Sequence, residues 1–563
     1  MCKLIDCNCV NDFHQDDSRQ TKLRFPTSMI LKDLPSTEGK VYNVKGDLEL
    51  VQVEELRRWP TSVEVMEELQ QMLRIGGPIV ITGLLLYARS MISMLFLGQL
   101  GELQLAGGSL AIGFANITGY SVLSGLAMGM EPICAQAFGA KQWKLLGITL
   151  QRAILFLLCA CLPIGLLWIN MRRILLWCNQ DKEITDVASM YLFCALPDLL
   201  AQAILHPLRI YLRTQQITLP LTKCAALALL LHIPINLLLV SALELKIRGV
   251  ALAAVWTNFN LVIFLLLYIW FSGLHGKSWD GWSAACFKDW KPLFNLAIPS
   301  CVSVCLEWWW YELMVIFSGL LPNPQATVAT MGILIQTTAL VYIFPSSLSF
   351  AVSTRVGNEL GAGRPEKARI ATLVALVCAG ILGFLAMMFT TTMRHLWGTM
   401  FTSDKAILSL IAMAMPLAGL CELGNCPQTT GCGVLRGSAR PSTGANINLG
   451  SFYLVGMPVA VILGFIWKLK FMGLWFGLMA AQGTCLVLML FALIRTDWIL
   501  EAARAKILTE TANGQSKDSS IDPVIHLAVN ESCVCRIFAE ESTGEKASLL
   551  SIEVVQGHFA TED

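Results

Sequence analysis

Between residues 75 and 494 the chain consists of long apolar runs separated by short polar breaks. We count twelve such runs of roughly 18–27 residues, and each can cross a hydrocarbon core ~30 Å thick as an α-helix. Only helices and closed barrels satisfy every backbone polar group in lipid, and the alternating pattern of barrel strands is absent. The sequence therefore predicts an all-α polytopic membrane protein with twelve transmembrane helices. They are expected to start near Ile75, Ala106, Leu146, Met190, Leu219, Val250, Leu293, Ala326, Ala368, Ile407, Ala445 and Phe471.

The apolar region also contains an internal sequence repeat. Prolines and glycines in similar surroundings recur in the same order, 221 to 224 positions apart. Membrane proteins made of two repeated halves commonly hold a substrate path between them, because two similar bundles can rock about one site. The repeat predicts two six-helix lobes and favours a transporter. The matching pairs are Pro78 with Pro299, Gly139 with Gly361, Pro234 with Pro458, and Gly249 with Gly473.

Composition narrows the class further. The chain is 55% hydrophobic and 14% charged, with a mean hydropathy of +0.60, whereas soluble proteins carry about 25% charged residues. A net charge of +1 gives no reason to expect a nucleic-acid partner. No HExxH or GxSxG motif lies at a membrane boundary, which argues against an enzyme. We expect a monomer in contact with membrane lipid and a small organic solute, without a bound cofactor or metal.

Lysine and arginine are more frequent in the loops on the side that holds both chain ends. This bias is typical of cytoplasmic loops, so both termini are expected in the cytosol. No addressing motif decides between the plasma membrane and an endomembrane such as the late endosome, Golgi or vacuole. The expected organisation is a disordered N-terminal tail (1–50), an amphipathic lead-in (51–73), an N-lobe (74–273), an inter-lobe linker (274–291), a C-lobe (292–494) and a polar C-terminal tail (495–563) that needs no fold; the tails are possible sites for regulators.

Ionisable residues inside the predicted spans are candidate functional residues, because each costs roughly 2.5–3.5 kcal/mol at mid-bilayer. Glu307 follows Pro299 by eight residues, which is about 12 Å of helix and places it deep in the seventh span. Trp310 and Tyr311 follow at i+3 and i+4 and are expected to form a pocket around it. Glu312, at i+5, should point about 140° away.

Three more charged residues lie in spans: Asp198 in the fourth, Glu422 in the tenth and Arg89 in the first. Desolvation disfavours the charged form of a buried carboxyl group. Such an acid can load and release a proton near neutral pH, unless a basic partner or backbone amides hold it ionised. Arg89 could neutralise one of these acids across the cleft, bind an anionic solute, or extend towards the membrane surface.

Four sequence motifs resemble the multidrug and toxic compound extrusion (MATE) family. GMEPICAQAFGAKQ (129–142) resembles its ETLCGQAFGA signature, and CLEWWWYE (305–312) resembles the motif of span 7 in eukaryotic members. VSTRVGNELGAGRPEKAR (352–369) and CPQTTGCGVLRGSARP (426–441) resemble the connection between spans 8 and 9, and span 10. The resemblance extends over residues 60–500 and is greatest to a plant branch that includes abscisic-acid exporters and late-endosomal members.

The resemblance implies a V-shaped pair of six-helix lobes and a cation-driven antiporter, with H⁺ as the usual coupling ion in plants. The coupling acids of the family would be Glu307 and Glu422, with Glu312 as a further acid. The N-lobe aspartate of many bacterial members has no match, and its place falls near Ser93. Glu131 matches the glutamate of the signature and is expected to brace its loop.

These observations lead to the hypothesis of secondary active efflux of an organic solute by alternating access. The expected cleft is lined by spans 1, 2, 7, 8 and 10. An Na⁺-coupled exporter and a flippase for lipid-linked sugars remain as alternatives. Arg89 favours organic anions such as abscisic acid, whereas the acids and aromatic residues favour organic cations. The residues expected at the cleft are Arg89, Asp198, Trp310, Tyr311, Gln336, Tyr342 and Asn425.

Overall fold

The computed structural model describes residues 58–178, 180–279 and 281–513. Within these ranges it has no strand and twelve helical spans long and apolar enough to cross a membrane, as the sequence predicts. The first six are α2 (Ser62–Gln99); α3 (Glu102–Ala115) with η1 (Asn116–Tyr120), α4 (Ser121–Met128) and α5 (Met130–Gly139); α6 (Trp143–Ile169); α8 (Lys182–Thr214); α9 (Leu219–Asn236) with η2 (Leu237–Ala242); and α10 (Lys246–Phe271). The other six are α11 (Lys291–Gly319); α12 (Pro324–Gly361); α13 (Pro365–Met393); α14 (Lys405–Gly437); α15 (Pro441–Asn448) with η6 (Leu449–Gly456), α16 (Met457–Val461) and η7 (Ile462–Ile466); and α17 (Phe471–Ile494).

Several helices begin earlier than their apolar runs because polar residues cap their first turns. The first span starts at Ser62, thirteen residues before Ile75. Thr61 accepts a hydrogen bond from the Glu64 backbone amide, and the Glu64 side chain accepts one from that of Thr61. This reciprocal capping box satisfies two free amides. The described part of the expected lead-in is therefore continuous with the first span.

The internal repeat is visible in the turns. Pairs of residues with left-handed backbone conformation occur at equivalent positions of the two halves, 222 to 224 residues apart. Such a conformation is uncommon for residues other than glycine, so its recurrence shows that the same turns are built twice. The pairs are Lys141 with Gly363, Gln216 with Ala439, Glu244 with Lys468, and Lys246 with Lys470.

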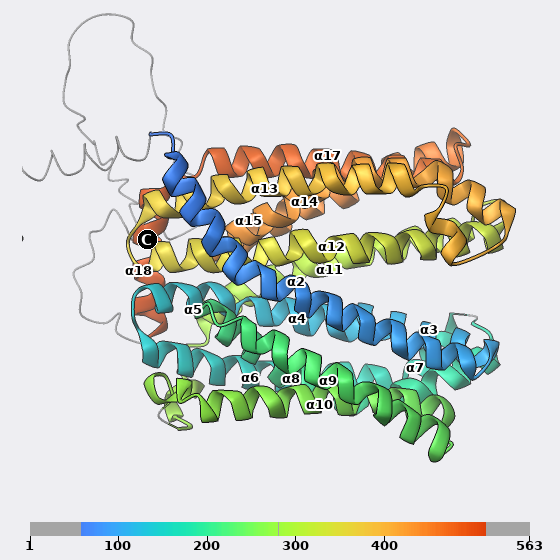
Figure 1. Cartoon of the computed structure of the whole chain (residues 1–563), viewed down its shortest axis with the longest axis horizontal. Helices are drawn as coiled ribbons and strands as arrows, with labels where there is room; N and C mark the ends of the chain where they lie inside the picture. The colour runs from blue at the N-terminus through green and yellow to red at the C-terminus, as the bar shows by residue number, and fades with distance from the viewer. Residues whose placement is uncertain (1–57, 179, 280, 514–563) are drawn as a thin grey trace, which may run out of the picture. The chain divides into compact units, whose positions relative to one another are not determined.

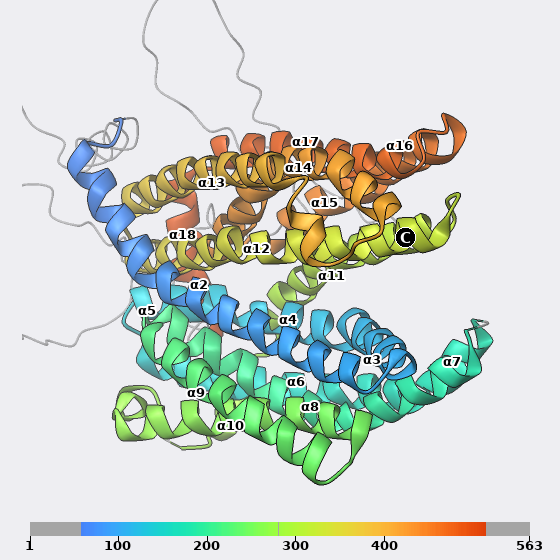
Figure 2. The same ribbon diagram turned by 45° about the vertical axis from the view of Figure 1, so that its right-hand side comes forward.

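Each half has its own hydrophobic core. One cluster of buried residues belongs almost entirely to helices α2 to α10, and the other lies within α11 to α17. Figure 1 shows these two groups of helices above and below a line near the middle of the molecule, with α2 crossing from the upper group to the lower one, and Figure 2 shows the same arrangement from another direction. Helix α2 contacts α12 and α13 as well as α9. The first span thus packs against both lobes.

The polar segment after the last span contains a helix that the composition did not predict. Helix α18 (Trp498–Ala512) starts at Asp497, whose side chain caps its first turn. It packs against α5 of one lobe and α12 and α13 of the other, at the end of the bundle where α2 begins and α17 ends (Figure 1). We call this end the terminal end. Arg152 of α6 donates a hydrogen bond to the carbonyl of Ala512 (3.0 Å). The N-terminal tail (1–50) and the rest of the C-terminal tail lie outside the described residues.

Candidate functional site

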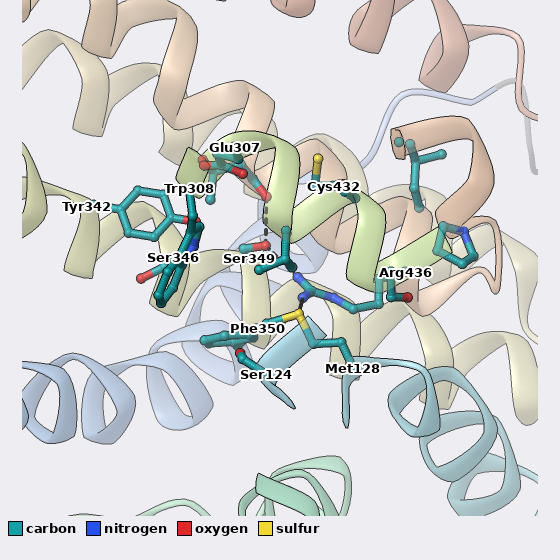
Figure 3. Close-up of a pocket in the computed structure, with 17 residues that line it drawn as sticks. Ser124, Met128, Glu307, Trp308, Tyr342, Ser346, Ser349, Phe350, Cys432 and Arg436 are labelled. Atoms are coloured by element: carbon teal, nitrogen blue, oxygen red, sulfur yellow. Dashed lines mark hydrogen bonds between the residues drawn. The ribbon is translucent and has the colours of Figure 1, made fainter. Parts of the chain in front are cut away.

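A cavity of about 230 Å³ lies between the two lobes (Figure 3). Helix α4 contributes Ser124 and Met128 from the N-lobe, and α11, α12, α14 and α15 contribute the other lining residues. Spans 2, 7, 8 and 10 therefore line it as expected, whereas span 11 replaces span 1. The lining combines serine and threonine hydroxyls with aromatic rings and two ionisable side chains of opposite charge, Glu307 and Arg436. Such a mixture can hold a polar organic molecule.

Glu307 is buried and reaches the cavity from α11. Its carboxyl group interacts with the side chains of Tyr342, on α12, and Gln428, on α14. Trp308 and Tyr342 line the cavity beside it (Figure 3). Glu307 and Tyr342, both expected at the cleft from the sequence, thus reach this cavity; the role of Glu307 in proton coupling stays a prediction.

The two aromatic residues expected around Glu307, Trp310 and Tyr311, do not line the cavity. Trp310 is buried in the C-lobe core against Phe452 and Tyr453, with ring centroids 5.7 and 6.2 Å away. Tyr311 is partly buried against the same core. The i+3 and i+4 face of α11 is directed into the lobe, so Trp308 at i+1 is the neighbour that reaches the cavity. Glu312 is half-buried and is not among the cavity-lining residues.

Glu422 lies deeper in the C-lobe, away from this cavity. It is buried, accepts a hydrogen bond from the Asn425 amide (2.9 Å), and borders a second, much smaller cavity between α12, α13 and α14. Asn425 is buried beside it, so neither residue reaches the larger cavity. Gln336 is exposed on α12, and its backbone carbonyl faces the Tyr87 hydroxyl at 3.5 Å.

A separate polar cluster is buried in the N-lobe. The Asp198 carboxylate accepts hydrogen bonds from the amide of Asn258 (2.6 Å), the hydroxyl of Tyr120 (2.8 Å) and the amide of Gln202 (3.3 Å). Arg89 donates to the other end of the Asn258 amide (2.7 Å). Arg89 and Asp198 are therefore linked through Asn258 and do not line the cavity. Arg89 thus lies near an acid of its own lobe, to which Asn258 links it, and not across the cleft from its acid.

Ser93, at the place of the missing aspartate, is buried against His232 (3.1 Å). The other ring nitrogen of His232 lies 2.7 Å from the Thr257 hydroxyl. Both ring nitrogens therefore have hydrogen-bonding partners within the lobe. Among the described residues there is no group of three or more His, Cys, Asp or Glu side chains arranged to hold a metal ion.

An inter-lobe group of four side chains was missed by the sequence reasoning. Glu131 of α5 does not merely brace its loop: its carboxylate lies 2.8 Å from the Arg213 guanidinium of α8 and 3.5 Å from that of Arg436 of α14. Both guanidinium groups lie near the ring of Phe350 of α12, at 4.0 and 5.2 Å from its centre. We call these four residues the junction. One signal was available, since Arg213 and Arg436 are 223 positions apart, at the offset of the repeat.

The lobes touch closely on the terminal side of the junction. A side-chain carbon added at Gly139 would lie 2.0 Å from the Asn358 carbonyl, and one at Gly361 would lie 2.0 Å from the Gln136 carbonyl. Only glycine permits so close an approach of two backbones. Gln136 also donates from its side chain to the Gly437 carbonyl (3.0 Å). These contacts hold the two lobes together on the terminal side, and the paired glycines of the repeat, Gly139 and Gly361, make two of them.

Comparisons with known proteins agree with this architecture. The MatE family model matches residues 78–238 and 299–462, one match for each half of the repeat. Protein DETOXIFICATION 48 and Protein DETOXIFICATION 49 of Arabidopsis thaliana are 62% and 61% identical to the chain, over 82% and 81% of its length and 87% and 91% of theirs.

Solved structures extend the agreement to the fold. The crystal structure of the eukaryotic MATE transporter AtDTX14 is 33% identical, with a TM-score of 0.77 over 79% of this chain and 100% of that one. The Vibrio cholerae MATE transporter VcmN is only 14% identical but matches with a TM-score of 0.67, covering 81% of this chain and 99% of its own, which shows a common fold. The two matched halves, the plant relatives and the fold together show that the chain belongs to the MATE family and is a multi-pass membrane transporter rather than an enzyme.

Proposed function

We propose that this transporter exports organic solutes in exchange for protons, and that the cavity is open to one side of the membrane at a time. The single observation that carries the proposal is the position of Glu307. It is a buried acid that lines the cavity between the lobes, where one carboxyl group can bind either a proton or the basic group of a solute. Glu422, buried deeper in the same lobe, would take part as a second acid.

Competition for one carboxylate is sufficient for exchange. A proton that enters down a potential of 100 mV gains about 2.3 kcal/mol, but export of a monovalent cation costs the same amount. One-for-one exchange is therefore driven by the pH gradient, which supplies about 1.4 kcal/mol for each tenfold difference in proton concentration to expel a solute that cannot share the acid with the proton. Such competition requires a solute with a positive charge. Trp308 and Tyr342 can contact its apolar or aromatic part. We therefore propose organic cations as the first substrate class. Arg89, the residue that favoured abscisic acid and other anions, lies outside the cavity.

We propose further that the terminal end, where α2 begins and α17 ends, faces the cytosol, because the more positively charged loops lie on that side. With its terminal end closed, the structure then represents the stage at which the cavity has no path to the cytosol. Release of the solute on the opposite side would precede uptake of a proton there. The cavity's single arginine, Arg436, lies close to Glu131, which gives the flippase alternative no strongly cationic cleft.

The test is uptake into inside-out vesicles that contain the purified protein, with an imposed pH gradient. The panel pairs a quaternary ammonium ion and an aromatic amine with an aromatic carboxylate. We expect gradient-driven accumulation of the cations by the wild type, its loss in Glu307→Gln, and its retention in Glu102→Gln, the same change at an exposed acid outside the cavity. Accumulation that persists in Glu307→Gln, or that follows an Na⁺ gradient and ignores a pH gradient, would refute proton coupling through Glu307.

A further inference from the structure

The junction holds two arginines and one acid, so its charges do not balance. Glu131 is fully buried, and the side chains of Arg213 and Arg436 are about nine-tenths buried. One carboxylate oxygen of Glu131 faces both guanidinium groups, and its other oxygen has no hydrogen-bonding partner. Burial of an uncompensated charge is costly, because the protein cannot replace the water that solvated it. The junction needs a further negative charge nearby.

The surplus positive charge of the junction arises at a position where the two halves of the repeat differ. Arg213 stacks on Phe350, and Arg436 contacts Met128, so each arginine meets a residue of the opposite lobe. Glu131 has no acidic counterpart: its equivalent is Ser353, whose buried hydroxyl lacks a hydrogen-bonding partner. A symmetric junction would carry two acids. The equivalent pairs, 222 or 223 positions apart, are Arg213 with Arg436, Met128 with Phe350, and Glu131 with Ser353.

A neighbouring group of ionised side chains in the same molecule has balanced positive and negative charges. Arg355 forms ion pairs with Glu68 of α2 (2.7 Å) and Glu359 (2.9 Å), and Arg364 pairs with Glu359 (2.7 Å). Two positive and two negative groups balance there. That group also joins the first span to the C-lobe, yet it has no contact with the cavity. Only the unbalanced junction includes a residue of the cavity wall, Arg436.

Glu307 can supply the missing charge. It lines the same cavity as Arg436, and their charges are close enough to interact; Figure 3 shows the guanidinium of Arg436 and the carboxyl of Glu307 on the same cavity. With Glu307 ionised, these two acids and two arginines sum to zero; Arg209, one turn before Arg213 on α8, adds positive charge near Arg213 and also interacts with Asp198. The other titratable side chains that interact with Glu307 are Tyr311, Tyr342, Glu422, Cys432 and Cys485. Of these only Glu422 is an acid, and it lies outside the cavity.

We propose that the junction keeps the terminal side closed only while Glu307 is ionised, and that a proton or a cationic solute on Glu307 removes the compensating charge and allows the junction to open. Arg436 is then a positioning residue that couples the charge of Glu307 in the cavity to the stability of the contact between the lobes. This inference rests on the proposed role of Glu307 as the acid that binds protons and solute.

The arrangement would link access from the terminal side to the state of Glu307. With Glu307 ionised, the charge of the junction is compensated and the closed terminal side is favoured. Either a proton or a cation neutralises Glu307 and leaves a net positive junction, which gains hydration when the lobes separate. Both loaded forms therefore favour an open terminal side, and release of the proton or cation favours its closure.

The test is a double-mutant cycle read by hydrogen–deuterium exchange of the purified, full-length protein at one pH. Peptides within residues 130–142 and 351–364 report the closed terminal contact. Glu307→Gln mimics the neutral acid and is expected to increase their opening equilibrium roughly 5- to 150-fold, the usual range of coupling between two sites. In an Arg436→Gln background, where Glu131 and Arg213 balance, the same change is expected to have an effect near one-fold. Glu102→Gln, at an exposed acid outside the cavity, should leave exchange unchanged.

An equal effect of Glu307→Gln in both backgrounds would overturn the proposal, as would no effect in the wild-type background. Melting temperature and exchange of peptides within 246–271 control for folding, and Arg213→Gln replaces Arg436→Gln if the latter does not fold. The outcome is independent of the transport assay. Loss of proton-driven uptake in Glu307→Gln with an unchanged cycle would refute the junction but leave the antiporter; an intact cycle without proton-driven uptake would refute the antiporter alone.

Discussion

The closest contact between the lobes offers a direct way to shift the conformational balance. A methyl group at Gly361 would lie 2.0 Å from the Gln136 carbonyl oxygen and 2.7 Å from two further backbone atoms, whereas ordinary contact starts at 3.4 Å. Gly361→Ala thus demands a displacement of 3.4 − 2.0 = 1.4 Å at that oxygen. Both partners are helical backbone, so neither can yield locally. The overlap lies between lobes, and separating the lobes relieves it without unfolding either core.

Overpacking of this kind costs about 1–3 kcal/mol. If the cost falls on the closed arrangement alone, the ratio of closed to open terminal side falls roughly 5- to 150-fold. The melting temperature should change little, because each lobe keeps its own core. Gly332→Ala is the matched control, since it lies on the same helix α12 and no heavy atom lies within 4 Å of the added methyl.

Cys432 is a natural probe for this shift because it lines the cavity. A small membrane-impermeant thiosulfonate is applied to inside-out and to right-side-out vesicles, and modification of Cys432 is measured by peptide mass spectrometry. We expect faster modification in Gly361→Ala than in Gly332→Ala from the terminal side only, which also identifies that side. Equal rates in both variants, with both folded, would refute the view that this glycine contact closes the cavity.

Three further variants test other parts of the structure. Asn258→Ala removes the link between Arg89 and Asp198 and should cost about 3 kcal/mol or more, because hydrogen bonds to charged groups contribute roughly 1.5–3 kcal/mol each; thermal unfolding in detergent measures it, and an unchanged midpoint would contradict the role. Asp497→Ala removes the cap of α18 at a cost of about 1 kcal/mol, so exchange of peptides within 498–512 should rise roughly fivefold. Burial raises the pKa of Glu501 above 4.5, so the protection of α18 amides from hydrogen exchange should fall as the pH rises from 4.5 through that raised pKa. Glu501→Gln should abolish this pH dependence. Protection that does not vary with pH in the wild type would contradict the prediction.

The sequence was sufficient to predict the helices of the fold, but not which side of each helix faces the cavity and which faces the lobe core. Long apolar runs and a repeat offset require only local physics, namely backbone satisfaction in lipid and helix length. The directions of Trp308 and Trp310 depend on how α11 rotates against the C-lobe, which no periodicity of a uniformly apolar helix records. The helix α18 was missed for a related reason: its docking face is mostly alanine and threonine around a buried Trp498, which composition reads as a polar tail.

Some residues of the candidate site could be predicted from the sequence and others could not. Glu307 was predictable because a charge in a membrane span is costly and must have a reason. Arg213 and Arg436 were not, because they stand near the ends of their helices, where arginine is ordinary and can reach the membrane surface. Their burial results from the contact between lobes, which the sequence of either lobe alone does not contain.

The two halves differ most where charge is concerned. The two halves share their glycines, their left-handed turns and one arginine each. These shared features form equivalent halves of the contact between the lobes. Where they disagree, Glu131 stands opposite Ser353, and Glu307 has Leu85 or Leu86 at the equivalent position. A fully symmetric junction would balance its own charges and could not respond to the cavity. The loss of one acid from the junction and the presence of another in the cavity wall let the binding of a cation in the cavity change the stability of the contact between the lobes.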